Sequence, residues 1–74
     1  MRVTNRDLKA KEEIVNKLLK NISLRVEGRY GYVAIDICDK SGKVLETLIA
    51  GLTKKQTYDI LDVVERILML ESKA

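Results

Sequence analysis

The chain has 74 residues, of which 46% are hydrophobic and 34% charged, and its formal net charge is +3. This length allows one domain, 1–74, whose core lies near the lower size limit for folding without further help. Cys38 is the only cysteine and histidine is absent, which excludes a disulfide framework and a tetrahedral zinc site. No apolar run approaches the roughly 18 residues that span a bilayer, and the N-terminus lacks the apolar stretch of a secretory signal. We therefore expect a cytoplasmic protein without membrane association.

The first predicted element is a helix over 5–21, with Thr4 as its N-cap and Asp7 favouring the positive end of the helix dipole. One face carries apolar residues at helical spacing: Leu8, Val15, Leu18, Leu19 and Ile22, with Ile14 at the edge. Lys11 interrupts this face, and we expect its aliphatic stem to lie along it. The positive charge is concentrated here, because residues 1–31 carry eight Lys or Arg and four Asp or Glu.

Two or three strands follow the helix. Apolar and polar residues alternate over 22–27, which indicates either a third antiparallel strand or an extended lead-in. A glycine-containing turn at 28–31 precedes a second alternating run at 32–38. The turn Asp39-Lys40-Ser41-Gly42 joins it to a strand from Val44 to Ala50, and Gly51 is expected to end that strand.

The last predicted element is a helix over 53–71. Thr53 and Gln56 form a capping box, in which each side chain can bond the backbone of the other residue. Its apolar positions fill about half of the helix circumference, whereas a helix on a single core usually shows a stripe nearer ~100° wide. These positions are Ile60, Leu61, Val63, Val64, Ile67, Leu68 and Leu70. Part of this helix is therefore expected to contact something beyond its own chain.

The elements together predict an α+β domain. It has an N-terminal helix, a two- or three-stranded antiparallel meander and a C-terminal helix, with both helices on one face of the sheet. With three strands the order is α-β-β-β-α.

Asp36 and Cys38 are the residues of the hairpin that could carry chemistry. Residues 34–45 resemble the first hairpin of the ribonuclease-H-like and sugar-kinase/actin superfamily, in which a strand aspartate binds metal or faces a phosphate. The other carboxylates with which such enzymes hold a divalent metal have no counterpart here. We therefore interpret Asp36 as a solvent-facing strand residue, and Cys38, which no histidine can activate, as a packing residue. We predict that the chain is not an enzyme and binds no cofactor or metal.

Two polar segments have more than one interpretation. Arg25, Arg29, Tyr30 and Tyr32 suit single-stranded nucleic acid, a protein-binding hot spot, or ordinary strand packing. The start of the second helix, 53–55, carries two lysines that oppose the helix dipole at a cost of a few tenths of a kcal/mol each. Ordinary solvent-exposed lysines are one interpretation of this segment, and an anion bound at the start of the helix is the other.

Two segments also resemble known proteins: Tyr-Gly-Tyr-Val-Ala-Ile-Asp at 30–36 and Gly-Leu-Thr-Lys-Lys-Gln-Thr-Tyr at 51–58. They resemble small uncharacterised proteins of phages and mobile elements, which have a β-hairpin, a Gly-Leu-Thr-Lys helix start and a short helix with a tyrosine. The similarity covers about residues 30–61, and its motifs are mostly structural. It implies a mobile-element accessory protein and assigns no activity or site residue.

Our leading hypothesis is a homodimeric, non-enzymatic module that binds another protein. The predicted dimer interface on the second helix consists of Ile60, Val64, Ile67 and Leu68. The predicted partner surface consists of Tyr30, Tyr32, Tyr58 and Met69. The alternative is a nucleic-acid-binding regulator that acts as a dimer, with contacts through Lys9, Lys17, Lys20, Arg25, Arg29, Lys54 and Lys55.

Overall fold

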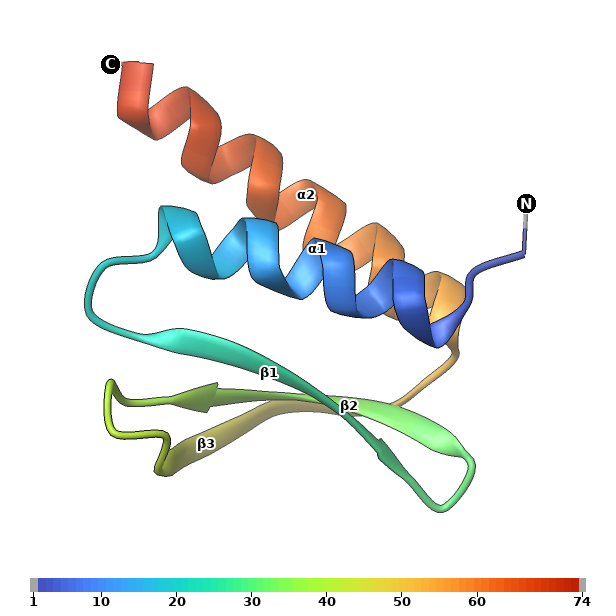
Figure 1. The fold of residues 1–74 in the computed structure, drawn as a ribbon. Helices are drawn as coiled ribbons and strands as arrows, with labels where there is room; N and C mark the ends of the chain where they lie inside the picture. The colour runs from blue at the N-terminus through green and yellow to red at the C-terminus, as the bar shows by residue number, and fades with distance from the viewer. Residues whose placement is uncertain (1, 74) are drawn as a thin grey trace.

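The computed structural model describes residues 2–73. Its elements are α1 (Asn5–Leu18), β1 (Ser23–Arg29), β2 (Tyr32–Cys38), β3 (Val44–Leu52) and α2 (Lys54–Lys73). The strands form one antiparallel sheet in the order β1-β2-β3, and both helices lie on one face of it (Figure 1). The predicted α-β-β-β-α fold is confirmed, and residues 23–27 belong to a strand rather than to an extended lead-in.

Helix α1 begins at a capping box, because Thr4 Oγ1 accepts from the Asp7 amide at 3.2 Å and Asp7 Oδ2 accepts from the Thr4 amide at 2.9 Å. The helix ends at Leu18, before the predicted end at 21. The Asn16 side chain explains the early end, since it bonds both the carbonyl and the amide of Leu24 at 2.9 and 2.8 Å. This bond pair ties the chain back onto β1, so Ile22 lies outside the helix.

The two hairpins use different turn chemistry. Tyr30 and Gly31 both have positive φ, 51° and 81°, as a two-residue type I′ hairpin turn requires. In the second turn, Asp39 Oδ1 accepts from the Ser41 hydroxyl at 2.6 Å and from the Lys43 amide at 2.9 Å. The Asp39 carboxylate therefore organises the predicted turn.

The end of β3 differs from the prediction. Gly51 was expected to end the strand, but β3 continues through it to Leu52. Leu52 pairs with Val33 and Ile49 pairs with Ile35, so the interval along β3 is one residue longer than the interval along β2. Gly51, at φ +75°, absorbs the additional residue as a bulge in the ladder.

Helix α2 starts at the predicted capping box. Thr53 Oγ1 accepts from the Gln56 amide at 3.1 Å, and Gln56 Oε1 accepts from the Thr53 amide at 2.9 Å. Its 20 residues make it longer than α1, which has 14. No helix in residues 2–73 is long and apolar enough to cross a membrane.

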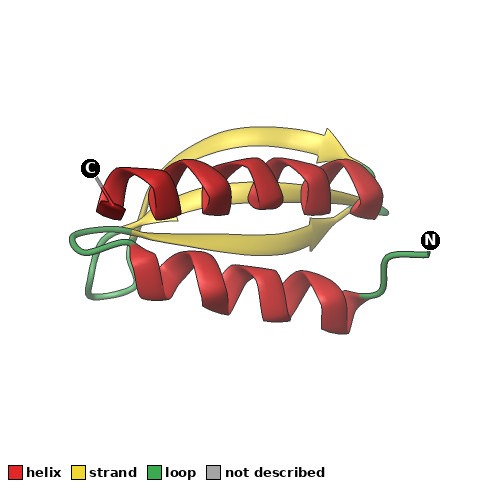
Figure 2. Cartoon of the chain, turned by 90° about the horizontal axis from the view of Figure 1, so that it is seen from above, coloured by secondary structure: helices red, strands yellow, loops and turns green. Residues whose placement is uncertain are grey.

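The core lies between the helices and the sheet. Its buried members are Val3, Leu8, Val15, Leu24, Val33, Ile35, Leu52 and Leu61. Helix α1 packs against β1 and α2, and α2 packs mainly against α1 and β2. Figure 2 shows the consequence: β3 lies beyond α2, at the side of the sheet that the two helices leave uncovered.

Candidate functional site

An apolar stripe runs along the outer side of α2. Val63, Ile67 and Leu70 are 55%, 60% and 68% exposed, and at about 100° per residue they share one side of the helix. Ile60 continues the stripe toward the start of the helix and is partly buried. The core of this chain therefore explains only part of the apolar surface on α2.

Strand β3 is the second uncovered apolar element. Every residue from Val44 to Gly51 is exposed, although the strand carries Leu45, Leu48 and Ile49. It is an edge strand, so one side of its backbone has no partner strand among residues 2–73. Soluble proteins usually protect such edges with charges or proline. Here Glu46 is the only charged residue in the strand, and proline is absent from the whole chain.

Lys11 fixes the orientation of α2 relative to α1. Its Nζ donates to Asp62 Oδ1 at 2.8 Å and to Glu65 Oε1 at 2.6 Å, and its side chain is 11% exposed. The hydrogen bond to Asp62 has the largest effect on the pKa of Lys11, and that to Glu65 the second largest. Together they hold this pKa well above its ordinary value. The same bond from Lys11 lowers the pKa of Asp62. The side of α2 that carries these carboxylates therefore faces α1.

The apolar stripe lies on the opposite side of α2, toward β3. Ile67 follows Asp62 by five residues, which at about 100° each places the two side chains roughly 140° apart around the helix. The stripe also borders a shallow hollow of about 290 Å³, which is lined by Asp59, Ile60, Val63 and Val64. We refer to the stripe (Ile60, Val63, Ile67, Leu70) together with β3 as the α2–β3 surface.

The predicted dimer interface lies only partly on this surface. Ile67 is exposed, whereas Ile60, Val64 and Leu68 are partly buried and pack against the core. Val63 and Leu70 are exposed, whereas Val64 and Leu68, which were predicted to form the interface, are partly buried. The exposed apolar side of α2 is therefore turned around the helix axis relative to the prediction. The core side of a helix and its exposed side cannot be separated by spacing alone when apolar residues cover both.

The predicted partner residues do not form one surface. Tyr30 is fully exposed at the β1–β2 turn, Tyr32 is 57% exposed nearby, and Met69 is 43% exposed on α2. Tyr58 is different, because it packs partly against the core with the Lys11 ammonium 5.3 Å from its ring centre. Contacts within the chain therefore account for part of the apolar surface of Tyr58, which was predicted to lie on the partner surface.

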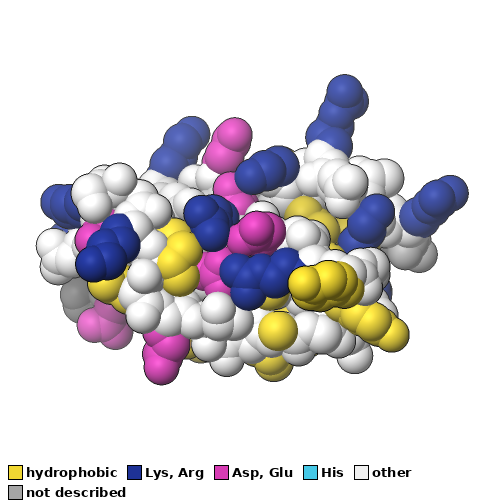
Figure 3. Space-filling model, turned by 90° about the horizontal axis from the view of Figure 1, so that it is seen from below, with side chains coloured by type: hydrophobic (Ala, Val, Ile, Leu, Met, Phe, Trp, Pro, Cys, Tyr) yellow, Lys and Arg dark blue, Asp and Glu magenta, His cyan; other side chains and the backbone are white. Residues whose placement is uncertain are grey.

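The face of the sheet away from the helices carries a charged cluster around Asp36. Asp36 is fully buried, so its interpretation as a solvent-facing residue was wrong. Its carboxylate accepts from Arg29 Nη2 and the Thr47 hydroxyl, both at 2.7 Å, and lies 3.4 Å from Arg25 Nη2. Figure 3 shows basic and acidic side chains in contact at the middle of this face. Side chains from both neighbouring strands cover the aspartate, which a strand pattern cannot reveal.

The predicted nucleic-acid contacts are divided among separate places. Arg25 and Arg29 each bind two carboxylates, those of Glu27 and Asp36. Lys9 and Lys54 line a cavity at the end of the molecule where both helices begin. The remaining candidates, Lys17, Lys20 and Lys55, are exposed elsewhere on the helices and the loop after α1. The part of the chain that the structure describes does not gather these side chains into one stripe.

Cys38 is buried, in agreement with its predicted packing role. No group of three His, Cys, Asp or Glu side chains in residues 2–73 is placed to hold a metal ion. Comparisons with protein-family models, curated proteins and solved structures found no match to this chain. The resemblance to small phage and mobile-element proteins therefore stays a prediction.

Proposed function

We propose that this protein is a small, non-enzymatic protein-binding module that acts as a homodimer formed through the α2–β3 surface. One observation carries the proposal: an apolar edge strand, uncovered by either helix, lies beside an exposed apolar stripe. In the proposed dimer, the β3 strands of two copies pair and the two α2 helices meet above them. The exposed Tyr30 at the β1–β2 turn remains free to contact another protein.

Self-complementarity favours a second copy as the occupant. Two identical edge strands related by a two-fold axis run antiparallel, so β3 can pair with β3 of the partner and extend the sheet. The same axis brings the two α2 stripes together on the helix-bearing face. Val63, Ile67 and Leu70 carry no charge, so neither copy has to bury an unpaired ion there.

The small size of the chain supports the same arrangement. A domain of this length buries only about 60% of the surface of its unfolded chain, so additional burial has a large relative effect. Each ~100 Å² of apolar surface that the dimer removes from water contributes about 2.5 kcal/mol before the costs of association. The exposed side chains on α2 and β3 offer such surface.

Sedimentation equilibrium over a hundredfold range of protein concentration tests the proposal. We expect a dimer, and we expect Ile67→Glu to give a monomer because each interface would receive two buried carboxylates. Met69→Glu is the matched control: it adds the same charge to the same helix, about 200° further around it. Circular dichroism of both variants should show intact helices, since both side chains are substantially exposed.

Leu48→Lys tests the strand part of the interface. Lysine on an edge strand opposes pairing with another edge, so this variant should also be monomeric while keeping its fold. A wild-type monomer at high micromolar concentration would refute the proposal. A wild-type dimer that survives both Ile67→Glu and Leu48→Lys would show that the copies meet elsewhere.

A further inference from the structure

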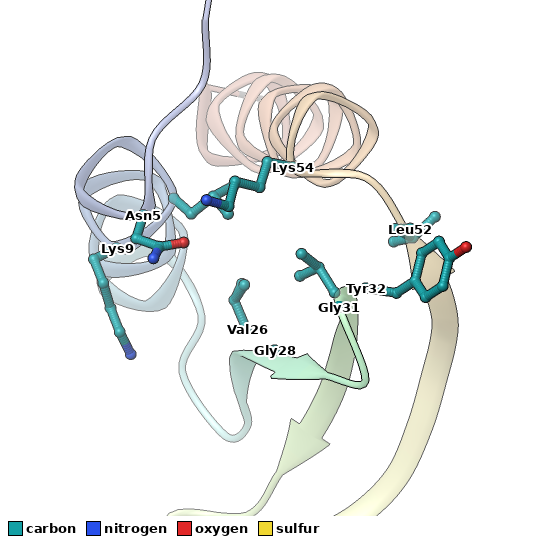
Figure 4. Close-up of a pocket in the computed structure, with 10 residues that line it drawn as sticks. Asn5, Lys9, Val26, Gly28, Gly31, Tyr32, Leu52 and Lys54 are labelled. Atoms are coloured by element: carbon teal, nitrogen blue, oxygen red, sulfur yellow. The ribbon is translucent and has the colours of Figure 1, made fainter.

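A cavity of about 560 Å³ opens at the end of the molecule where both helices begin. Leu8, Val33 and Leu52, which are buried core residues, contribute to its apolar lining. Figure 4 shows Lys54 reaching across the opening toward Asn5, with the sheet on the other side. The size of the cavity falls within the range of about 300–1,000 Å³ that is usual for small-molecule sites.

The charged side chains that line the cavity are all basic. Lys9 and Lys54 line it, and no aspartate or glutamate of residues 2–73 does. Lys9 Nζ lies 3.4 Å from Glu12 Oε1. Lys54, in contrast, takes part in none of the ion pairs found in the described part of the chain. Lys54 is also the first residue of α2, where a cation opposes the helix dipole. An anion in the cavity would remove this conflict.

Gly28 keeps the cavity open on its sheet side. It pairs with Val33, whose side chain belongs to the core, so a side chain at position 28 would also point toward the helices. Gly28 lacks the positive φ that would require glycine. A Cβ at this position would meet nothing nearer than the Tyr32 carbonyl oxygen at 4.0 Å.

Neither the backbone conformation at position 28 nor steric crowding around it requires glycine there. A glycine inside a strand weakens the strand, and it often marks a place where a ligand approaches the backbone closely. A ligand that lies against the backbone at Gly28 would account for the glycine.

We propose that this cavity binds a small organic monoanion. The apolar body of the ligand lies against Leu8, Val33 and Leu52, and its anionic group lies at the Lys54 ammonium. Lys9, on α1 at the edge of the opening, adds positive potential. This site is separate from the α2–β3 surface, so the proposal does not depend on dimer formation.

Titration with 2-naphthoate, followed by backbone amide NMR, tests the site. We expect saturable shifts that centre on Gly28, Gly31, Val33 and Lys54. 2-Naphthamide has nearly the same shape without the charge, and it should bind at least about tenfold more weakly, as loss of one charge-assisted hydrogen bond implies. Inorganic phosphate alone should give no saturable shifts at the same residues, because it has no apolar body.

Three variants locate the ligand. Lys54→Gln should weaken 2-naphthoate binding about tenfold, and Lys40→Gln, which removes one charge from an exposed turn, should leave it unchanged. Gly28→Val should abolish binding while it preserves or raises the melting temperature, because valine favours strands. Equal binding of naphthoate and naphthamide, unchanged binding by folded Gly28→Val, or no saturable shift would each overturn the proposal.

Discussion

At the scale of single residues, the sequence predicted which face of the sheet carries Asp36 but not that Asp36 is buried. Alternation correctly places it on the face of the sheet opposite Val33 and Ile35. Exposure does not follow from that placement, because Arg29 and Thr47 from the two neighbouring strands bond its carboxylate. Their approach depends on strand register, which a single strand pattern does not contain.

Replacement of Asp36 should therefore be costly. Asp36→Ala removes the acceptor for both arginines and Thr47, and we expect a loss of about 2 kcal/mol in the free energy of unfolding. Glu27→Ala is the matched control, since Glu27 binds the same two arginines from a more exposed position and should contribute less than about 1 kcal/mol. Urea unfolding followed by circular dichroism measures both. Equal losses would contradict the central role of Asp36.

The hydrogen bond between Lys11 and Asp62 should make the stability of the fold depend on pH. This bond lowers the pKa of Asp62 below the ordinary 3.8, so the stabilisation is present above that value and is lost as pH falls through the lowered pKa. Wild type should therefore lose more stability between about pH 5 and about pH 2 than Lys11→Met does. Lys17→Met, which removes from the same helix an exposed lysine without an ion pair among residues 2–73, should retain the wild-type dependence. Parallel urea titrations at several pH values would reveal the difference, and identical profiles for wild type and Lys11→Met would rule out this linkage.

At the scale of elements, the sequence predicted the strongly marked boundaries and missed those set by tertiary contacts. The capping box at Thr53 and the turn at Asp39 were predictable because their bonds are local. Helix α1 ends early because Asn16 bonds Leu24, a contact between two elements. Strand β3 runs through Gly51 because the pairing with β2 continues beyond it.

Gly51 allows a direct test of the bulge. Its φ of +75° is unfavourable for any residue with a Cβ, so Gly51→Ala should cost about 1–2 kcal/mol of stability. Gly28→Ala is the matched control, because Gly28 lacks a positive φ and alanine should be neutral or stabilising there. Thermal unfolding of the two variants gives the comparison. A Gly51→Ala variant as stable as wild type would show that β3 does not need the bulge.

At the scale of the whole molecule, the sequence predicted the α+β arrangement and an apolar excess on α2. It did not predict that β3 would lie beyond the helices, since the placement of α2 over β2 depends on packing against α1. It also did not predict the cavity, whose lining comes from α1, α2 and all three strands. Sites formed by several elements require the relative positions of those elements, which spacing along one chain does not supply.

The proposed dimer makes thermal stability depend on protein concentration. When folding and association are coupled, mass action favours the folded dimer as concentration rises. For a dimer of chains this size, the usual unfolding enthalpy implies that the melting temperature rises by about 5 °C for each tenfold increase in concentration. Ile67→Glu should show no such rise, and Met69→Glu should follow wild type. Differential scanning calorimetry over a hundredfold range measures the slope, and a wild-type melting temperature independent of concentration would contradict coupling between folding and dimer formation.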